Sequence, residues 1–340
     1  MKAWATALMA GYAAEYPGVL FARSAFVNDL DRWLSLMRRG EFADAWNISD
    51  ASLRDRAGKT CWHLPRHEQW VWNGTPLTNK RVLIRCYHGL GDTLQFIRYV
   101  PMVRRIAKHV TVWAQPSLLP LLEGDVLPLH DGTVDCEYDT DVEIMELAHV
   151  FRTTIDSIPN DVPYIHVIPA NIDRDRRLAV GIVWRSGEWD ERRNVPFRLI
   201  ESLADIDGVK LFSLQRDPDY YSDRITLLDG ADDPLTTAQL MRAMDLVITI
   251  DSMPAHLAGA LGVPTWTLLP ADADWRWMED RDDSPWYPTM RLFRQQRSDD
   301  WTPVVERVRA ALATIAPHGR LLGNAAREEA GDQRRLQSIR

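Results

Sequence analysis

The sequence predicts an α/β protein in which two halves each build a parallel sheet, preceded by a short helical segment. Short apolar runs alternate with amphipathic stretches from about residue 80, and the same alternation restarts at residue 178. Such alternation is typical of chains that wind strands and helices into parallel sheets. In the first 57 residues, apolar side chains instead recur every three or four positions, as in helices. The length of 340 residues is enough for two domains.

The first 57 residues are predicted to be helical. One face of an early helix collects Phe26, Leu30, Trp33, Leu34 and Met37. Gly40 ends this helix, and a second helix continues through Trp46. The turn between them is similar to one tetratricopeptide hairpin, but such repeats bury their faces against neighbouring copies. Because only one copy is present, we expect a docking or capping element.

The strand and helix pattern also sets the expected domain boundaries. The first set opens with a strand at 81–86, and a polar stretch at 171–177 separates it from a second set that opens at 178–184. Parallel strands of this kind are joined by right-handed crossovers. The last helix is expected to end near Ala316. The expected divisions are a helical segment at 1–57, an α/β domain at 58–172, a second α/β domain at 173–320 and a polar tail at 321–340.

Charge and cysteine content exclude several classes of protein. With 48 acidic against 40 basic residues, the net charge of −8 argues against a nucleic-acid binder, which needs a basic surface. Cys61, Cys86 and Cys136 form no CxxC pair, so we expect reduced thiols rather than disulfides or a zinc site. No apolar run reaches the roughly 18 residues of a membrane span. We therefore expect a cytoplasmic protein without a transmembrane segment, for which peripheral membrane contact stays open.

The turn at 88–93, with the sequence His-Gly-Leu-Gly-Asp-Thr, lies between a predicted strand and a predicted helix. In open α/β sheets, ligands bind where strands end, and glycines there let the backbone approach a ligand closely. A dinucleotide fingerprint would need a third glycine at Leu94 and an acid after the second strand, where Gln115 stands. The turn therefore argues against dinucleotide binding.

Asp92 in this turn has two interpretations. In the first turn of a helix, a carboxylate stabilises the helix through its charge and its hydrogen bonds. The same carboxylate can act as a general base that takes the proton from an acceptor hydroxyl. The turn alone leaves both interpretations open.

A second turn, 251–256, follows the apolar predicted strand 246–250. Asp251 or Ser252 can cap the next helix, and Pro254 suits its first turn, so free backbone N–H groups are expected to point outward. Such a helix start can hold a diphosphate. His256 is placed either to donate to a phosphate or ribose or to pack beneath the turn.

Two arginines follow the strand at 178–184 and its terminal Trp184. Arg192 and Arg193 can neutralise a departing diphosphate in place of a metal, although a solvated run of charge is an equal alternative. Asp-x-Asp pairs arise readily by chance in a chain with 48 acids, and none lies in a clear cluster of ligands, so no metal is expected. These pairs are Asp139/Asp141, Asp217/Asp219 and Asp272/Asp274.

Seven short motifs occur in a fixed order between about residues 60 and 315. They are Arg66-His67-Glu68-Gln69, Trp72-Asn73-Gly74, the stretch from Gly89 to Pro101, the stretch from Asp251 to Pro264, Asp274-Trp275-Arg276-Trp277, Ser284-Pro285-Trp286-Tyr287-Pro288 and Leu292-Phe293-Arg294-Gln295. In this order they resemble the family 9 glycosyltransferases, the ADP-heptose:lipopolysaccharide heptosyltransferase superfamily. The resemblance is greatest to the bacterial branch that carries tetratricopeptide-like helices.

The resemblance implies a GT-B fold of two Rossmann-like domains, with the acceptor held by the first and the donor by the second. It implies metal-independent, inverting transfer of a sugar from a nucleotide-diphosphate donor, with Asp92 as the base and no cofactor beyond the donor. Heptose follows only by association, and the acceptor is a glycan, a lipid-linked molecule or a protein. The implied donor-side residues are Trp184, Arg192, Arg193, Gln215, Asp251, Ser252 and His256. The implied acceptor-side residues are His88, Gly89, Gly91 and Gln95.

Two positions depart from the family pattern. Gln215 stands roughly where the family has a nucleoside-contacting acid, which puts the ribose contact in doubt. Arg192 or Arg193 replaces a lysine that helps to neutralise the donor phosphates.

Two other functions stay open. One is a non-catalytic nucleotide-sugar or glycan-binding module with a helical docking segment, and the other is a nucleotide-sugar epimerase. Donor hydrolysis or transfer would distinguish an enzyme from a binder, and conversion of a free nucleotide sugar would favour the epimerase.

Overall fold

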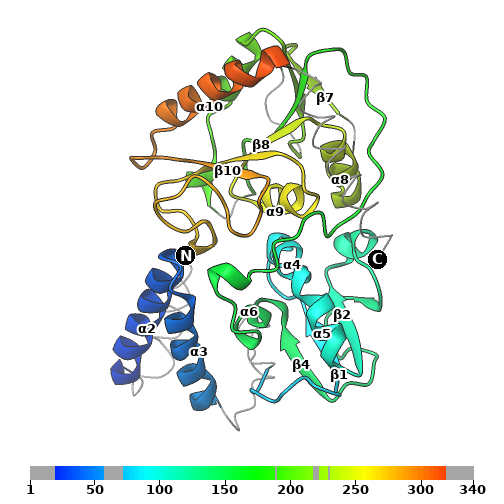
Figure 1. Ribbon diagram of the computed structural model, residues 1–340, viewed down its shortest axis with the longest axis vertical. Coiled ribbons are helices and arrows are strands. Elements are labelled where there is room, and N and C mark those ends of the chain that lie inside the picture. Colours follow the sequence, from blue (N-terminus) through cyan, green and yellow to red (C-terminus); the bar gives the residue numbers. More distant parts are fainter. Residues whose placement is uncertain (1–19, 57–71, 188–189, 217–221, 229, 319–340) are drawn as a thin grey trace.

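The computed structural model describes residues 20–56, 72–187, 190–216, 222–228 and 230–318. Two sheets lie one above the other in Figure 1, and a pair of helices lies beside the lower one. The first 19 residues of the expected helical segment, the motif at 66–69 and the polar tail at 321–340 fall outside the described residues.

The two helices at the start of the described chain are α2 (Leu20–Arg38) and α3 (Phe42–Arg56). They join at Gly40, whose φ of +77° is the left-handed conformation that favours glycine at a helix end. Met37, Phe42 and Trp46 are buried, and the Trp46 indole donates to the Thr153 carbonyl at 2.7 Å. The helices are thus built into the protein core, and their likeness to a tetratricopeptide hairpin stays a prediction.

The first sheet has four parallel strands in the order β3-β2-β1-β4. Its strands are β1 (Arg81–Arg85), β2 (His109–Ala114), β3 (Val126–Pro128) and β4 (Thr140–Glu143). Its α-helices are α4 (Leu90–Phe96), α5 (Val100–Ile106) and α6 (Leu147–Val150). The strand order reverses between β1 and β4, so the ends of these two strands flank a switch point, where ligands bind in open sheets.

The second sheet has six parallel strands in the order β10-β9-β8-β5-β6-β7. Its strands are β5 (Leu178–Ile182), β6 (Val209–Ser213), β7 (Ile225–Leu227), β8 (Leu246–Ile250), β9 (Thr265–Leu269) and β10 (Met290–Arg294). Its α-helices are α7 (Phe197–Glu201), α8 (Pro234–Arg242), α9 (Met253–Ala260) and α10 (Thr302–Ile315). Strands β5 and β8 are buried along their whole length, as continuous apolar runs of parallel sheets are. Their order places a second switch point between them.

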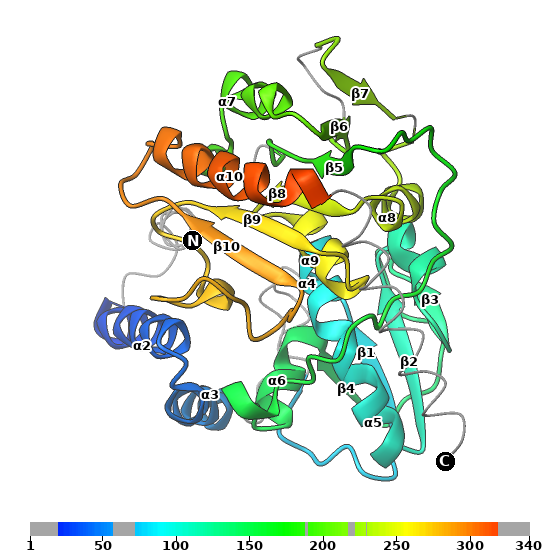
Figure 2. The ribbon, with the colours of Figure 1, turned by 45° about the horizontal axis from the view of Figure 1, so that its top comes forward.

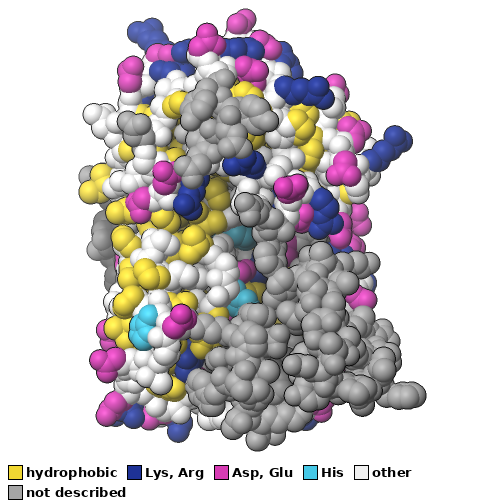
Figure 3. All heavy atoms as spheres, turned by 180° about the vertical axis from the view of Figure 1, so that it is seen from behind, with side chains coloured by type: hydrophobic (Ala, Val, Ile, Leu, Met, Phe, Trp, Pro, Cys, Tyr) yellow, Lys and Arg dark blue, Asp and Glu magenta, His cyan; other side chains and the backbone are white. Residues whose placement is uncertain are grey.

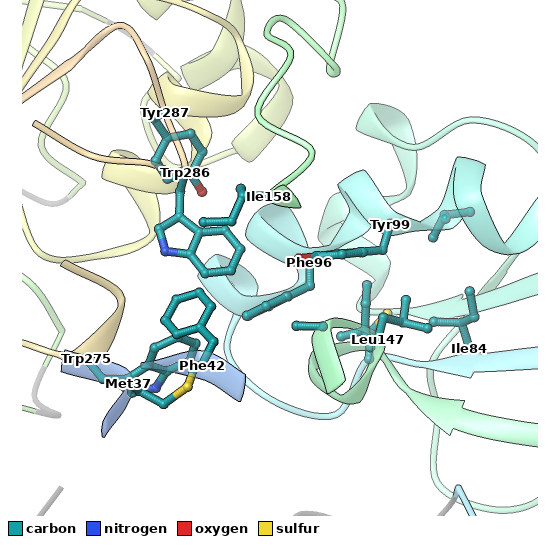
Figure 4. Close-up of a cluster of buried hydrophobic side chains, with 14 of the residues drawn as sticks. Met37, Phe42, Ile84, Phe96, Tyr99, Leu147, Ile158, Trp275, Trp286 and Tyr287 are labelled. Carbon is teal, nitrogen blue, oxygen red and sulfur yellow. The ribbon is translucent and has the colours of Figure 1, made fainter. Parts of the chain in front are cut away.

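One hydrophobic core crosses the boundaries between the helical pair and the two sheets (Figure 4). Trp286, from the segment before β10, packs on Phe96 of α4 at a ring distance of 5.7 Å and on Phe42 of α3 at 6.2 Å. The segment before the second sheet also contacts the second domain. The Tyr164 N–H donates to the carbonyl of Ala260, at the end of α9, at 3.0 Å. The three parts therefore bury apolar surface against one another.

Arg98 is a buried cation within this boundary. Its guanidinium donates to the Trp286 carbonyl at 2.5 Å and to the Tyr164 hydroxyl at 2.8 Å, and it lies 4.6 Å from the Tyr287 ring centroid. Carbonyl oxygens and ring faces thus hold a charge that would be costly to bury without partners. Arg98 connects the helix after α4 to the second domain.

Charged side chains of both signs are intermixed on the upper half of the molecule when it is seen from behind (Figure 3). None of the described helices combines the length and apolar character that crossing a bilayer requires.

Candidate functional site

The two switch points meet where the start of α4 lies against the start of α9 (Figure 2). Gly91 makes this approach possible, because a Cβ there would lie 2.8 Å from His256 Cδ2 and 3.5 Å from the Met253 Cα. We expected Gly91 to leave room for an acceptor sugar. His256 fills that space instead, so the glycine serves contact between the domains.

Asp92 lies in the first turn of α4 and is 22% exposed. One carboxylate oxygen, Oδ2, accepts from the Gly89 N–H at 2.9 Å, and Oδ1 accepts from Arg276 Nη2 at 2.5 Å. Gln115 steadies the turn by donating to the His88 carbonyl at 2.8 Å. Asp92 therefore both helps to begin its helix and forms an ion pair with the other domain.

Arg276 is the partner that the sequence did not reveal as a site residue, although its motif was noted. It follows β9 in the short 3-10 helix η9 (Trp275–Trp277), where it also pairs with Asp274 at 2.9 Å. Burial lowers the pKa of its guanidinium, but Asp274 and then Asp92 outweigh burial and raise the pKa above its ordinary value. Arg276 therefore stays charged and is shared between two carboxylates.

A second carboxyl, that of the buried Glu143, lies near Asp92. It ends β4, its Oε2 accepts from the Met145 N–H at 2.7 Å, and its Oε1 lies 3.9 Å from His88 Nε2. Burial raises its pKa well above the ordinary value, and the charges of Glu146 and Asp92 raise it further. The carboxylate paired with Arg276 therefore lies beside an acid whose protonated form is favoured by burial. The sequence pattern predicts no strand at 140–143, so Glu143 is found only from the structure.

Asp251 follows the buried strand β8, on the donor side of the expected site. Burial raises its pKa to about 6, the charge of Asp274 adds to this, and Arg193 opposes it. Arg193 reaches the same turn, since its Nη1 donates to the Asp251 carbonyl at 2.8 Å. Ser252 precedes α9 and its hydroxyl does not cap the helix. A cation, a helix start and a carboxyl that titrates near pH 6 therefore share this turn.

His256 is buried in the first turns of α9. Its Nδ1 shares a hydrogen bond of 2.9 Å with the Tyr287 hydroxyl, and its ring stacks on Trp277 at 5.3 Å. Burial lowers its pKa well below the ordinary value, and Arg276 and Arg98 lower it further. His256 is therefore a neutral ring packed beneath the turn, as one of its two interpretations expected.

Two residues expected on the donor side, Trp184 and Gln215, are engaged in contacts within the protein. Trp184 is buried and packs on Phe197 at 5.2 Å. Gln215 is saturated: its oxygen accepts from the N–H groups of Trp184 and Arg185, and its amide donates to the carbonyls of Arg185 and Arg216. We expected Trp184 on the donor side and Gln215 near the nucleoside. The geometry instead makes them supports for the turns after β5 and β6.

Two further expected residues lie away from the pair of turns. Arg192 is 57% exposed and binds Asp190 at 2.8 Å, so only Arg193 of the two arginines points to Asp251. Gln95, expected on the acceptor side, is fully buried, and its amide has no hydrogen-bond partner among the described residues. A buried side chain cannot line an open acceptor site.

The described aspartates of the Asp-x-Asp pairs are each bound to an arginine. The pairs are Asp139 with Arg81, Asp141 with Arg85, Asp272 with Arg38 and Asp274 with Arg276. Asp217 and Asp219 lie outside the described residues. Within the described part of the chain, no three His, Cys, Asp or Glu side chains group as metal ligands.

Comparison with known proteins places the fold. A glycosyltransferase of family 9 from Veillonella parvula superposes with a TM-score of 0.52 at 15% identity, over 73% of this chain and 100% of that one. The chain has the fold of a family 9 glycosyltransferase. A second structure in this comparison, ADP-heptose lipopolysaccharide heptosyltransferase II of Escherichia coli, gives a TM-score of 0.48 at 15% identity, over 70% of this chain and 99% of that one. The prediction of two parallel-sheet α/β halves is confirmed.

Sequence comparison adds one relative. The chain is 25% identical over 296 residues to "Protein FlbA" of Caulobacter vibrioides, a match that covers 72% of this chain and 48% of that protein. The chain therefore spans about half the length of this relative. No protein-family model matches the chain.

Proposed function

We propose that this protein transfers a sugar from a nucleotide-diphosphate donor to an acceptor hydroxyl, with Asp92 as the general base. The observation that carries the proposal is the Asp92–Arg276 pair, formed where the switch points of the two sheets meet. Ligands of open α/β sheets bind at such points. A carboxylate from one sheet and cations beside the other are what a base and a diphosphate leaving group require.

The proposed reaction is a single displacement with inversion. The acceptor hydroxyl gives its proton to a free lone pair of Asp92, and its oxygen forms a bond to the anomeric carbon. The bond from that carbon to the diphosphate breaks, and its electron pair leaves with the phosphate oxygen. Among the described residues, each Asp92 oxygen accepts one hydrogen bond, which leaves a lone pair on each for the acceptor proton.

Two arginines are proposed to stabilise the leaving group without a metal. Arg193 already lies at the Asp251 turn, and Arg276 has Asp274 and Asp92 as alternative partners. When the donor binds, Arg276 turns from Asp92 toward the diphosphate, which strengthens Asp92 as a base because an ion pair holds a carboxylate in its charged form. The start of α9 supplies backbone donors to the same phosphates.

The first experiment identifies the donor. A thermal-shift panel of ADP-, GDP-, UDP- and TDP-sugars is expected to find one that stabilises the protein, since a ligand at 100 times its dissociation constant adds about 2.7 kcal/mol. We propose that the reaction is cytoplasmic, so these soluble donors are the ones to test. The donor that binds is then supplied with glycan, lipid-linked and protein acceptors.

The second experiment tests the base. Asp92→Asn is expected to keep donor affinity and to lower turnover by a factor of about 10² to 10⁴, the contribution of a general base. Unchanged turnover would remove Asp92 from the role. Donor binding by the wild type without transfer or hydrolysis would favour the non-catalytic binding module.

A further inference from the structure

A cavity separate from the Asp92–Arg276 pair lies between the helices α2 and α3 and the first domain. Its volume is about 300 Å³. Four indole rings form much of its wall: Trp33, Trp46, Trp72 and Trp275. We call it the indole cavity. Neither the proposed base nor the donor-side turn lines it.

The rings of the indole cavity stand at steep angles to one another. Trp33 meets Trp275 at 5.4 Å and 78°, and it meets Trp46 at 6.3 Å and 59°. Three of the indole N–H groups are already bound: Trp33 donates to Ser49 Oγ, Trp46 to the Thr153 carbonyl and Trp72 to the Thr75 carbonyl. These three N–H groups are therefore already used within the protein, and the aromatic rings are what these residues contribute to the cavity wall.

The charge in the cavity wall is negative. Asp29 and Glu146 line it, and no lysine or arginine does so among the described residues. His149 also lines it, but its Nε2 is hydrogen-bonded to Asp50 at 2.7 Å. Burial lowers the pKa of His149, and Arg152 lowers it further against the pull of Asp50, so the ring is neutral at pH 7. The charged side chains that line the wall among the described residues are therefore acidic, which favours a cation over an anion.

One ring of the cavity already holds a cation. The Arg276 guanidinium lies 5.0 Å from the Trp275 ring centroid, and its charge is balanced by Asp92 and Asp274. Its Nη2 also lies 4.0 Å from the sulfur of Met145, another wall residue. The indole cavity is therefore one layer of side chains away from Asp92.

We propose that the indole cavity binds an alkylammonium group, such as the trimethylammonium head of choline or of a trimethylated lysine. Walls of tryptophan favour cations that shed water easily, and they do so most strongly when the cation is enclosed. The carboxylates of Asp29 and Glu146 add attraction for the charge and disfavour anions. A neutral apolar group of the same shape would also bury its surface in the cavity. It would gain neither the cation–π attraction nor the attraction to the two carboxylates.

Calorimetric titration of the full chain tests the charge. Choline chloride is compared with 3,3-dimethyl-1-butanol, in which a carbon replaces the nitrogen, at matched ionic strength. Choline is expected to bind about tenfold more tightly, the ratio that a partly desolvated cation–π contact provides. Equal binding of the two would show a merely apolar cavity and overturn the proposal, as would no binding of either.

Variants test the location. Trp33→Leu keeps an apolar wall but removes a ring face, and Asp29→Asn removes a charge from an exposed position, so each is expected to weaken choline binding several-fold. Asp31→Asn, on the same helix but outside the cavity wall, is the matched control and should change nothing. Circular dichroism checks that Trp33→Leu is folded. If both cavity variants keep the choline affinity, the site lies elsewhere and the proposal fails.

Two probes distinguish the source of the group. Phosphocholine represents a lipid headgroup, and the amide of Nα-acetyl-Nε-trimethyllysine represents a protein side chain. The carboxylates of Asp29 and Glu146 should repel the phosphate, so the lysine derivative is expected to bind more tightly. Tighter binding of phosphocholine would support the same chemistry with a lipid source.

Discussion

The turn after β1 and the turn after β8 are built alike and place their acids differently. Each follows a buried parallel strand and starts a helix, and each carries an aspartate. Asp92 is partly exposed and reaches across to Arg276, whereas Asp251 is buried and has a pKa of about 6. Two turns of similar sequence pattern therefore hold one carboxylate that is partly open to solvent and one that is buried, with a raised pKa.

The contrast shows that the environment, rather than residue type, decides what an acid can do. Asp92 gains a cation from the other domain, while burial raises the pKa of Glu143 beside it and so disfavours its charged form. Four sets of substitutions test this contrast, and they are given in decreasing order of the change expected.

Removing the shared cation should have the largest effect on stability. Arg276→Ala leaves Asp92 and Asp274 without their partner in a largely buried site, so the free energy of unfolding should fall by about 3 to 5 kcal/mol. Urea unfolding at pH 7 measures this. Arg281→Ala is the control, because its bond to the exposed Asp283 is worth under about 1 kcal/mol. A loss as small as that of the control would mean that the pair does not hold the two turns together.

The buried acid should make stability depend on pH. The folded-state pKa of Asp251, about 6, lies above its ordinary value of 3.8. The contribution of Asp251 to stability is therefore nearly complete at about pH 4 and is lost as pH rises through 6. One pKa unit corresponds to about 1.4 kcal/mol, and the group is only half ionised at pH 6. The wild type should therefore lose about 2 kcal/mol relative to Asp251→Asn between pH 4 and pH 6. Unfolding curves at pH 4, 5, 6 and 7 measure the difference, and parallel pH profiles would contradict it.

The two neighbouring arginines should differ in donor affinity. Arg193 contacts the Asp251 turn, so Arg193→Ala is expected to weaken donor binding about tenfold, or about 1.4 kcal/mol. Arg192 is bound to Asp190 and faces solvent, so Arg192→Ala should leave affinity nearly unchanged. Titration with the donor found in the thermal-shift panel compares them. Equal losses would place both arginines at the phosphates.

The smallest effect is expected at Glu143. Because burial raises the pKa of this acid well above its ordinary value and so favours its protonated form, Glu143→Gln replaces it by a neutral side chain of similar shape. Its amide oxygen can still accept from the Met145 N–H, so stability and turnover should change by less than about 1 kcal/mol. Urea unfolding and transfer assays at pH 7 measure both. A loss of turnover like that of Asp92→Asn would instead show that Glu143 exchanges a proton during the reaction.

The sequence predicted the elements and turns that depend on local pattern. Strands near 81–86 and 246–250, the glycine at the end of α2 and a last helix ending near Ala316 all follow from spacing and composition, and each is confirmed. Strand β4 was missed because its four residues, Thr-Asp-Val-Glu, have no apolar run. These residues form a strand because their backbone pairs with β1.

The candidate site was less predictable because its partners are far apart in the chain. Asp92 and Arg276 are 184 positions apart, and nothing in either motif shows that they touch. The expected roles of Trp184 and Gln215 depended on which way their side chains point, and packing turns both inward. Contacts between distant segments decide such orientations, and local pattern does not contain them.

The buried Arg98 has a consequence for how the molecule comes apart. Separating the two sheets would pull its guanidinium off the Trp286 carbonyl and open the shared core of Phe42, Phe96 and Trp286 to water. We therefore expect the two sheets, which count as two domains by topology, to unfold together rather than one after the other. A cut in the polar stretch at 171–177 would yield two fragments, each with an unfinished apolar face that only the other can cover.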